Sequence, residues 1–360
     1  MRILHLLSQL ELTGAESYAI TLAERQIECG HRVFVVSDTL NMNTQAKYLR
    51  LEFNKRGILD RYNHIRFLTD FIRREKVDVV HSHSRASSWS GHISSRLCRT
   101  PHFTSVHQIL PGGLSKRFLP CLGDVSFAIC ENAKKAIIEN YGFPPYRIKV
   151  IRNAVDLNRF IIRELPGREL NIAIVGRYSG PKGKVLIWYL REVISKVDEK
   201  VKPFNLLIVG RQVDEIVREV ENVSSCLRAC RLKQLGFVDD IEKIYKNTAI
   251  VIGAGRVAVE AILSGRCVLA LGERGFLGLV KRENLYDMER SSFGDCLFED
   301  EFNVDFAVNE TIFAIENYMD IINHKRKLVE KVKELHDAEI IEAQINDVYR
   351  RLLHKRGQQS

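Results

Sequence analysis

The chain has 360 residues, of which 45% are hydrophobic and 28% are charged, and this composition is typical of a globular protein. A chain of this length favours two domains, each with its own core. No apolar run reaches the roughly 20 residues that cross a bilayer, which excludes a helical membrane span. The N-terminus lacks the pattern of a signal peptide, so we expect a cytoplasmic protein.

The net charge of +9 belongs to the first part of the chain. Residues 1–155 hold 22 Lys and Arg but only 13 Asp and Glu, and the remaining residues are balanced. This excess of positive charge indicates an anionic partner, such as a membrane surface, a phosphorylated acceptor or a nucleic acid, unless it only solvates the surface. The chain has no recognisable motif for reading nucleic acid, which argues against the last of these partners.

The eight cysteines are scattered along the chain, and only Cys226 and Cys230 lie close together in sequence. A single pair at this spacing is a weak signal for a metal site, because a closed site needs about four ligands. We therefore expect reduced, partly buried thiols.

Strands and helices alternate along the first half of the chain. Apolar runs predict strands at residues 2–7, 31–37, 77–83, 102–107, 125–130 and 148–151. Helical patterns predict helices at about residues 15–29, 44–56, 62–75, 84–97 and 132–140. Strands separated by helices are typical of a parallel, doubly wound sheet.

A linker at about residues 153–169 precedes a second half with the same plan. Strands are predicted at residues 171–175, 204–209, 248–252 and 267–271, and a helical stretch closes the chain at about 305–355. The sequence thus predicts an α/β protein with two Rossmann-like, doubly wound domains, at residues 1–155 and 156–335, that face a central cleft. We expect residues 336–360 to form a helix packed back on the first domain. Ligands should bind at the carboxyl ends of the strands.

A turn with glycines and cations opens the second half. The apolar run 171–175 is followed by Gly176 and Arg177, then by Lys182 and Gly183, after which a helical pattern begins. Fixed positive charge and free backbone N–H groups at a strand-to-helix turn are suited to a phosphate group. The alternative is a pair of solvated surface cations.

Several short motifs follow one another along the chain. They are LTGAE at residues 12–16, VDVVHSH at 77–83, SVH at 105–107, CEN at 130–132, VIRNAVD at 150–156, IVGRYSGPKG at 174–183, GFVD at 236–239 and EA at 260–261. In this order they resemble the retaining, nucleotide-sugar-dependent glycosyltransferases of family four, which have the GT-B fold. Ala154 stands where that family more often has glycine.

The resemblance assigns the donor diphosphate to Arg177 and Lys182. When the bond between sugar and diphosphate breaks, negative charge develops on the distal phosphate, and cations already in place stabilise that transition state. Two side-chain cations could replace a bound Mg²⁺, and the chain lacks an Asp-x-Asp motif, so we expect neither a metal nor a cofactor. The expected donor is a nucleotide diphosphate sugar, with UDP favoured and GDP or ADP as alternatives.

Further donor contacts are implied by the resemblance at Gly14, Ala15, Gly176, Gly236, Phe237, Gly253, Ala254, Gly255, Arg256 and Glu260. The helix that opens at Arg256 could offer its N-terminal N–H groups to phosphate and a third cation, although a tight turn would also need these glycines. Glu260 matches the second glutamate of the family's E-x7-E motif, which holds the ribose. The first glutamate would fall at Ile252, so recognition of the donor sugar departs from the family pattern.

The remaining candidate residues lie in the first half. By resemblance, His107 lies near the donor sugar, although a histidine at a strand end is often structural. His81 and His83 share one face of a strand, and a zinc site would need further ligands that the sequence does not show. Candidate acceptor contacts are His83, Arg85 and Trp89, with packing of the arginine on the tryptophan as the structural alternative.

We therefore predict a metal-independent, retaining glycosyltransferase with Arg177, Lys182 and His107 as catalytic residues. The basic first domain would meet a cell-envelope glycan, such as lipopolysaccharide or another lipid-linked saccharide, at the inner face of the cytoplasmic membrane. Residues 110–120 mix apolar and basic side chains, as either a connecting loop or a membrane-contacting segment would. Alternative functions are a sugar-nucleotide epimerase of the same architecture and a non-catalytic nucleotide-binding module.

Overall fold

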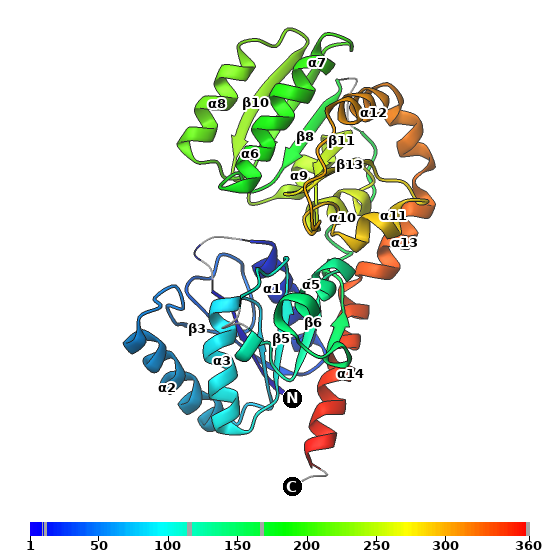
Figure 1. Ribbon diagram of the computed structural model, residues 1–360. Coiled ribbons are helices and arrows are strands. Elements are labelled where there is room, and N and C mark those ends of the chain that lie inside the picture. The colour runs from blue at the N-terminus through cyan, green and yellow to red at the C-terminus, as the bar shows by residue number, and fades with distance from the viewer. Residues whose placement is uncertain (9, 11–12, 114–116, 166–168, 358–360) are drawn as a thin grey trace. The chain divides into compact units, whose positions relative to one another are not determined.

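The computed structural model describes residues 1–8, 10, 13–113, 117–165 and 169–357. Leu12 of the first motif, the middle of the loop at 110–120 and part of the predicted linker lie outside these residues. The chain divides into two compact units, which we call unit 1 (residues 1–155 and 336–360) and unit 2 (residues 156–335) (Figure 1). Of the described helices, none is both long enough and apolar enough to cross a bilayer.

Unit 1 contains, within the described part of the chain, a parallel sheet of seven strands in the order β3-β2-β1-β4-β5-β6-β7. The strands are β1 (Arg2–Leu6), β2 (Arg32–Ser37), β3 (Lys47–Arg50), β4 (Val79–Ser82), β5 (His102–Val106), β6 (Val125–Ala128) and β7 (Ile148–Val150). The strand order reverses between β1 and β4. In sheets of this type, ligands bind at the carboxyl ends of the strands next to that reversal.

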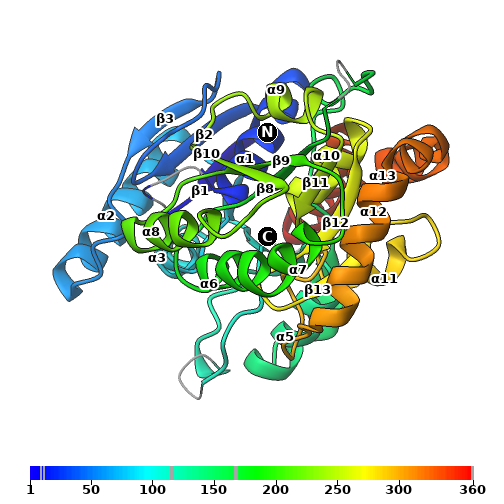
Figure 2. The ribbon, with the colours of Figure 1, turned by 90° about the horizontal axis from the view of Figure 1, so that it is seen from above.

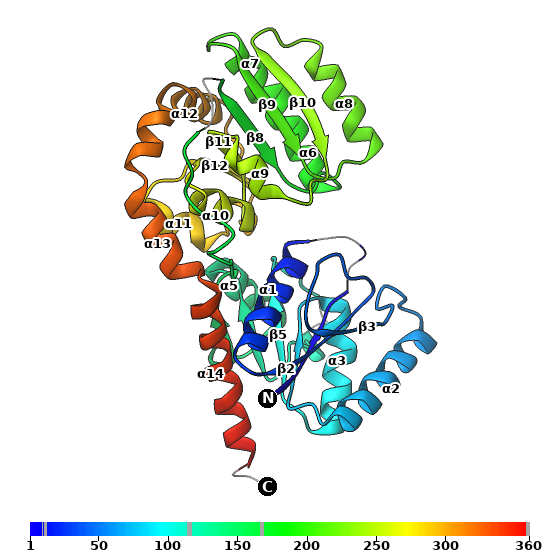
Figure 3. The ribbon, with the colours of Figure 1, turned by 180° about the vertical axis from the view of Figure 1, so that it is seen from behind.

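Helices cover both faces of this sheet, because successive side chains of a strand point to opposite faces. Ile3 of β1 belongs to a buried cluster with Tyr18 of α1 (Gly14–Glu28) and Tyr349 of α14 (Ala338–Gly357). The next residue, Leu4, belongs to another cluster with Leu68 of α2 (Ile58–Glu75). Figures 1 and 3 show α2 beside α3 (Arg85–Cys98), with α14 on the other side of the sheet.

The C-terminal helix completes the core of unit 1. Its side chains Ala338, Ile341 and Ile345 are buried in the same cluster as Phe103 of β5 and Phe127 of β6. The remaining short elements of the unit are α5 (Glu131–Tyr141), which follows β6, and the 3₁₀ turn η1 (Pro145–Arg147). Residues at the two ends of the chain therefore share one hydrophobic core.

The helix predicted at residues 44–56 is wrong. This segment contains the edge strand β3, in which Lys47–Arg50 pair in parallel with Phe34–Ser37 of β2. The hydroxyl of Tyr48 also donates to the carbonyl of Ser37 at 3.2 Å. An edge strand takes its backbone hydrogen bonds from its neighbour, so pairing with β2 outweighs a weak local helical pattern. Helix α2 then begins at Ile58, earlier than predicted.

Unit 2 contains a described sheet of six strands in the order β10-β9-β8-β11-β12-β13, of which only β13 runs antiparallel to its neighbour. The strands are β8 (Asn171–Val175), β9 (Phe204–Val209), β10 (Cys230–Gly236), β11 (Ile250–Gly253), β12 (Cys267–Leu271) and β13 (Phe276–Leu279). The edge strands β10 and β13 were not among the predicted strands, because half-exposed β10 and four-residue β13 carry weak apolar signals. Figure 2 shows β10, β9, β8 and β11 side by side.

The helices of unit 2 are α6 (Pro181–Trp188), the π-helical turn η2 (Tyr189–Ile194), α7 (Ser195–Asp198), α8 (Asp214–Ser224), α9 (Ile241–Lys246), α10 (Arg256–Leu263), α11 (Leu285–Arg290), α12 (Val304–His324) and α13 (Arg326–His336). Side chains from α6, α8 and α12 share one core with β8 and β9, and α10 packs on β11 and β12. The helical stretch predicted at residues 305–355 is confirmed, with breaks at Lys325 and Asp337. The predicted α/β fold with two Rossmann-like domains is also confirmed.

Three histidines form a buried hydrogen-bonded cluster in unit 1. His5 of β1 pairs in register with His81 of β4. The Nδ1 of His5 lies 2.8 Å from the Nε2 of His83. The other ring nitrogen of His5, Nε2, lies 2.8 Å from Oε1 of Gln26, and the hydroxyl of Tyr349 lies 2.5 Å from Nδ1 of His81. Burial lowers the pKa of His5 to about 4 and lowers the pKa values of His81 and His83 well below their ordinary range.

We expect acid to destabilise the protein through this cluster. As the pH falls from 7, the unfolded chain binds protons on its histidines near pH 6.5, whereas folded His5 does so only near pH 4. The free energy of unfolding should therefore fall between these pH values, by roughly 3 kcal/mol for His5 alone. Urea denaturation at pH 7, 6 and 5 measures this slope. His5→Gln should flatten the slope and His354→Gln, at an exposed position, should leave it unchanged; a slope that His5→Gln does not alter contradicts the prediction.

Candidate functional site

Glycines stand at the carboxyl ends of the five mutually parallel strands of unit 2. They are Gly236 at the end of β10, Gly210 after β9, Gly176 after β8, Gly253 at the end of β11 and Gly272 after β12. The strand order reverses between β8 and β11, so the segments that follow these two strands flank the switch point of the sheet. This edge is where an α/β sheet ordinarily binds a ligand.

The segments after β8, β9 and β10 are held together by their backbones. The N–H of Gly176 donates to the carbonyl of Val209 at 3.0 Å, and the N–H of Gly210 donates to the carbonyl of Gly236 at 2.7 Å. Gly210 has a φ of +130°, and a Cβ atom there would lie 1.6 Å from the carbonyl oxygen of Gly176. The positions of Gly176 and Gly236, both predicted site residues, therefore depend on Gly210, which no sequence motif indicated.

Arg177 and Lys182 extend from this edge into different surroundings. Arg177 is exposed and forms no ion pair with any residue that the structure describes. Lys182, in the first turn of α6, is partly buried, and its Nζ donates to Oδ2 of Asp295 at 2.9 Å. Burial lowers the pKa of Lys182, but the charge and hydrogen bond of Asp295 outweigh burial, so this pKa lies above its ordinary value. The charge of Arg177 acts in the opposite direction, which shows that the two cations lie within each other's field.

Asp295 is a site residue that the sequence did not indicate. Its Oδ1 accepts the backbone N–H of Glu273 at 2.9 Å, while Oδ2 accepts from Lys182. A Cβ atom on Gly255, where φ is +55°, would lie 3.3 Å from Oδ2. Asp295 therefore joins the start of α6 to the segment after β12, and its carboxylate lies close to the start of α10. It lies beyond α11 in the chain and outside every motif, so only the tertiary structure reveals it.

Ile252, where the resemblance implies a glutamate, lies inside the sheet of unit 2. Ile252 is a fully buried residue of β11 that pairs with Ile174 of β8 and Leu269 of β12. Only Ala254 and Gly255 separate β11 from α10. A carboxylate at position 252 would lie inside the sheet, where an unpaired charge is costly. Ile252 therefore contributes to the packing of the sheet, and no carboxylate stands at this position.

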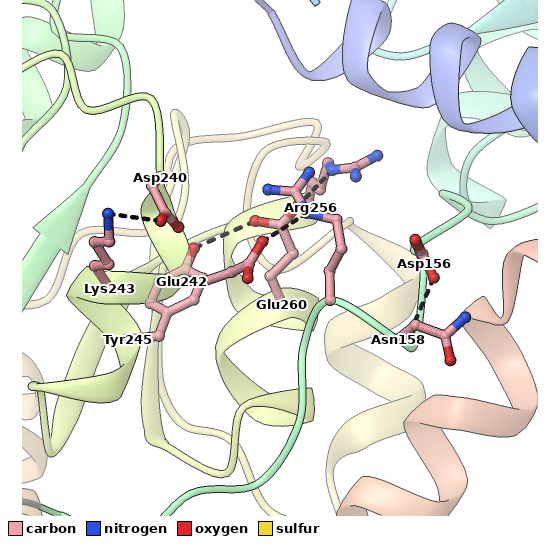
Figure 4. Close-up of polar contacts among 9 residues, drawn as sticks. Asp156, Asn158, Asp240, Glu242, Lys243, Tyr245, Arg256 and Glu260 are labelled. Atoms are coloured by element: carbon pink, nitrogen blue, oxygen red, sulfur yellow. Dashed lines mark hydrogen bonds and ion pairs between the residues drawn. The ribbon is translucent and has the colours of Figure 1, made fainter. Parts of the chain in front are cut away.

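Arg256 and Glu260 form an ion pair on α10 (Figure 4). Nε of Arg256 lies 2.5 Å from Oε1 of Glu260, and both side chains are nearly buried. The hydroxyl of Tyr245 donates to Oε2 of the same carboxylate at 3.4 Å, and burial together with the charge of Glu260 raises the pKa of Tyr245. The charge of Arg256 is thus balanced within unit 2. The ribose contact of Glu260 and the phosphate contact of Arg256 stay predictions.

Unit 1 places its own candidate residues at the reversal of its sheet. Helix α1 begins at Gly14 and Ala15, after β1, and the Oγ1 of Thr13 caps it by accepting the N–H of Glu16 at 3.2 Å. A Cβ atom on Gly14 would meet nothing within 4 Å, so this turn is open. His107 follows β5, next to the strand that carries the buried His81.

His107 is a neutral histidine at neutral pH. Burial lowers its pKa to about 4, against a hydrogen bond with Asn153 that raises it. Its ring meets Tyr18 edge-on at 4.9 Å, and its Nε2 has no partner among the described residues. His83 is buried behind it, with ring centroids 6.1 Å apart, and is bonded to His5. His83 and His107 each have one buried ring nitrogen without a partner among the described residues, and of the two residues His107 is the one that is partly exposed.

The remaining acceptor candidates have partners of their own. The guanidinium of Arg85 lies over the ring of Tyr141 at 5.2 Å and donates to the carbonyl of Pro120. Trp89 is covered by the guanidinium of Arg61 at 4.7 Å. The structural alternative, packing of Arg85 on Trp89, is therefore not what the structure has. Arg85 packs on Tyr141, and Arg61 packs on Trp89. The acceptor role of both residues stays a prediction.

The cluster of His5, His81 and His83 has ring nitrogens spaced closely enough to bind a metal ion. The ligand nitrogens of His5, His81 and His83 lie within 4.8 Å of one another. His5 already bonds His83 and Gln26 through its two ring nitrogens, and His81 bonds Ser105 and Tyr349. A cation would have to break these bonds inside the core, so the arrangement fits a structural network better than a metal site.

A family model matches the first part of the chain. Residues 12–159 match Glycosyltransferase Family 4. The A subunit of human phosphatidylinositol N-acetylglucosaminyltransferase is 23% identical over 291 residues, which are 74% of this chain and 58% of that protein. The chain thus matches less than two thirds of the length of this curated relative.

Solved structures share the fold along almost the whole chain. A glycosyltransferase from Rickettsia africae has a TM-score of 0.77 at 18% identity, over 98% of both chains. HepE from Anabaena, solved in complex with UDP and glucose, has a TM-score of 0.75 at 18% identity, over 97% of this chain and 99% of that chain. The fold is that of the GT-B glycosyltransferases, and together with the family match it supports a glycosyltransferase.

We expect Gly210→Ala to disrupt this edge of unit 2. The added Cβ would collide with the backbone of Gly176, which cannot move as a flexible side chain can. The variant should lose more than about 3 kcal/mol of unfolding free energy, measured by urea denaturation. Gly236→Ala, which also has a positive φ but open space around its Cβ, is the matched control and should lose about 1 kcal/mol. Equal losses in both variants would show that the contact with Gly176 is unimportant.

Proposed function

We propose that this protein transfers a sugar from a nucleotide diphosphate sugar to an acceptor, with retention of configuration and without a metal ion. The observation that carries the proposal is the pair Arg177 and Lys182 at the switch point of unit 2. They stand on a turn whose backbone is lined by glycine and so is open to a phosphate group. UDP is the favoured nucleotide, in line with the UDP bound to HepE.

The two cations would act on the leaving group. As the glycosidic bond of the donor breaks, charge builds on the diphosphate, and cations fixed beforehand stabilise this state more than the ground state. Asp295 fixes Lys182 through the 2.9 Å hydrogen bond and keeps it protonated. Arg177, without a carboxylate partner among the described residues, can offer its planar guanidinium to two phosphate oxygens. Together they would neutralise the charge of the leaving diphosphate, as a bound divalent cation does in other enzymes.

The other donor contacts would come from neighbouring segments of the same edge. Phe237 is 52% exposed directly after Gly236, so its ring is available to stack on a nucleobase. Glu260, held by Arg256 and Tyr245, would bind the ribose. Because buried Ile252 offers no carboxylate for the sugar, we propose that neutral His107 hydrogen-bonds a sugar hydroxyl. The leaving phosphate would accept the acceptor proton on the same face, which is the route to retention.

The acceptor is proposed to be a cell-envelope glycan on a lipid carrier. Unit 1 carries the excess positive charge of the chain, which suits a phosphorylated lipid at the cytoplasmic face of the membrane. The start of α2 exposes Ile58 (89%), Leu59 (77%) and Tyr62 (61%) beside exposed Lys55 and Arg56. We call these five residues the α2 patch. Adjacent apolar and basic side chains are what a protein needs to rest on an anionic membrane.

Loss of either cation should abolish most of the transfer. Arg177→Ala and Lys182→Ala should each lower kcat by about 100-fold, because each removes a charge that is needed most in the transition state. The assay measures nucleotide diphosphate release from a panel of nucleotide sugars in the presence of a lipid-linked acceptor. Lys184→Ala, an exposed lysine in the same helix, is the matched control and should keep full activity.

Three results would contradict the proposed function. One is the absence of release with every donor. Another is unchanged activity in Arg177→Ala. A third is turnover of the nucleotide sugar without any acceptor, which would identify a sugar-nucleotide epimerase instead. Saturable nucleotide binding without turnover would identify a binding module.

The α2 patch should bind vesicles that contain anionic lipid. Co-sedimentation with phosphatidylglycerol-containing vesicles should weaken about tenfold in the double variant Ile58→Ser with Leu59→Ser, because two apolar side chains can no longer enter the bilayer. The matched control is Ile161→Ser with Ile162→Ser, a pair of half-exposed isoleucines in unit 2. No binding to anionic vesicles, or equal weakening in both variants, would exclude the patch as the contact.

A further inference from the structure

A hollow lies in unit 1 at the amino-terminal end of β5. It has a volume of about 660 Å³ and lies between the end of α3, the start of β5 and the end of α14. This volume is within the range of about 300–1,000 Å³ that ordinary small-molecule sites have. The elements α3 (cyan) and α14 (red) belong to the same unit in Figure 1.

Within unit 1, the hollow lies at the opposite end of β5 from His107. His102, which lines it, is the first residue of β5, whereas His107 follows the last. A five-residue strand is roughly 16 Å long, so one small ligand cannot fill both places. Any ligand of this hollow is therefore distinct from the donor and from a sugar near His107.

The charges in the hollow are predominantly positive. Arg96, Arg99 and Arg356 line it, together with one carboxylate, that of Asp124. Asp124 is already engaged, because its Oδ1 lies 2.9 Å from a guanidinium nitrogen of Arg356 and its Oδ2 accepts the backbone N–H of His102 at 2.9 Å. Arg96 and Arg99 form no ion pair with the described residues, so their charges remain for a ligand.

Polar side chains without partners face the same hollow. His102 is 2% exposed and uses its Nε2 on the hydroxyl of Ser82 at 2.9 Å, but its Nδ1 has no partner among the described residues. The buried hydroxyl of Ser95 and the Nδ1 of His92 also have no hydrogen-bond partner among the described residues. Buried polar atoms without a hydrogen bond cost roughly 1–3 kcal/mol each, so several around one hollow indicate a missing polar occupant.

We propose that this hollow is a binding site for a small phosphate-bearing ligand, distinct from the donor site. Two unpaired guanidinium groups provide the fork geometry that phosphate oxygens favour. Ser95 and the two histidines supply neutral hydrogen-bonding groups at the base of the hollow. Burial is the largest cause, and Arg96 a further one, of the lowered pKa values of His92 and His102. A bound anion would favour the protonated form of both rings.

Calorimetric titration with inorganic phosphate and with glucose 6-phosphate tests this site. Ionic strength is held constant with chloride, and the protein carries Arg177→Gln so that the donor site contributes little. We expect saturable binding that weakens at least about tenfold in the double variant Arg96→Gln with Arg99→Gln, because charge-assisted hydrogen bonds are lost. The matched control, Arg66→Gln with Lys149→Gln, removes two exposed charges elsewhere in unit 1 and should bind as before.

A direct readout separates local binding from a general charge effect. In ¹⁵N-edited NMR, the imidazole signals of His92 and His102 should shift on addition of either phosphate compound, while the signal of exposed His324 in unit 2 should not. Absence of saturable binding, binding that Arg96→Gln with Arg99→Gln leaves unchanged, or shifts confined to His324 would overturn the proposal. Because these experiments do not measure transfer, their failure would leave the proposed glycosyltransferase activity intact.

Discussion

The close backbone contact between Gly176 and Gly210 is the constraint on which the candidate site depends. A Cβ atom on Gly210 would lie 1.6 Å from the Gly176 carbonyl oxygen, so the segments after β8 and β9 can approach this closely only without a side chain there. The contact places the turn that carries Arg177 against the end of the sheet. It also leaves main-chain atoms, rather than side chains, at the surface that would meet a diphosphate.

Two cations at this edge are paired with carboxylates, and Arg177 beside them is exposed. Lys182 is paired with Asp295 and Arg256 with Glu260, whereas Arg177 is exposed. Pairing restrains the long side chains and reduces the repulsion among three cations on neighbouring turns. A diphosphate that binds at Arg177 would therefore meet a field that is already organised, which is the condition for electrostatic stabilisation of a leaving group.

Much of the fold follows from the sequence pattern, and the errors have physical reasons. Most of the buried strands were predicted because apolar residues dominate them, as in β8 and β11. The edge strands β3, β10 and β13 were missed, since an edge strand alternates or is short and takes its bonds from a neighbour that local patterns do not contain. The turn with Arg177 and Lys182 was predictable because its glycines and cations are contiguous. Asp295 was not, because nothing near it in the sequence marks it.

The sequence by itself determined the alternation of strands and helices, the glycine turns and the excess positive charge of the first 155 residues, because these are properties of neighbours along the chain. Only the tertiary structure decided which side chains meet. It brought Asp295 to Lys182, Tyr245 to Glu260 and Arg356 to Asp124, each across a separation that no local pattern spans. It also showed Ile252 inside the sheet, because burial depends on the neighbouring strands and not on the motif that contains the residue.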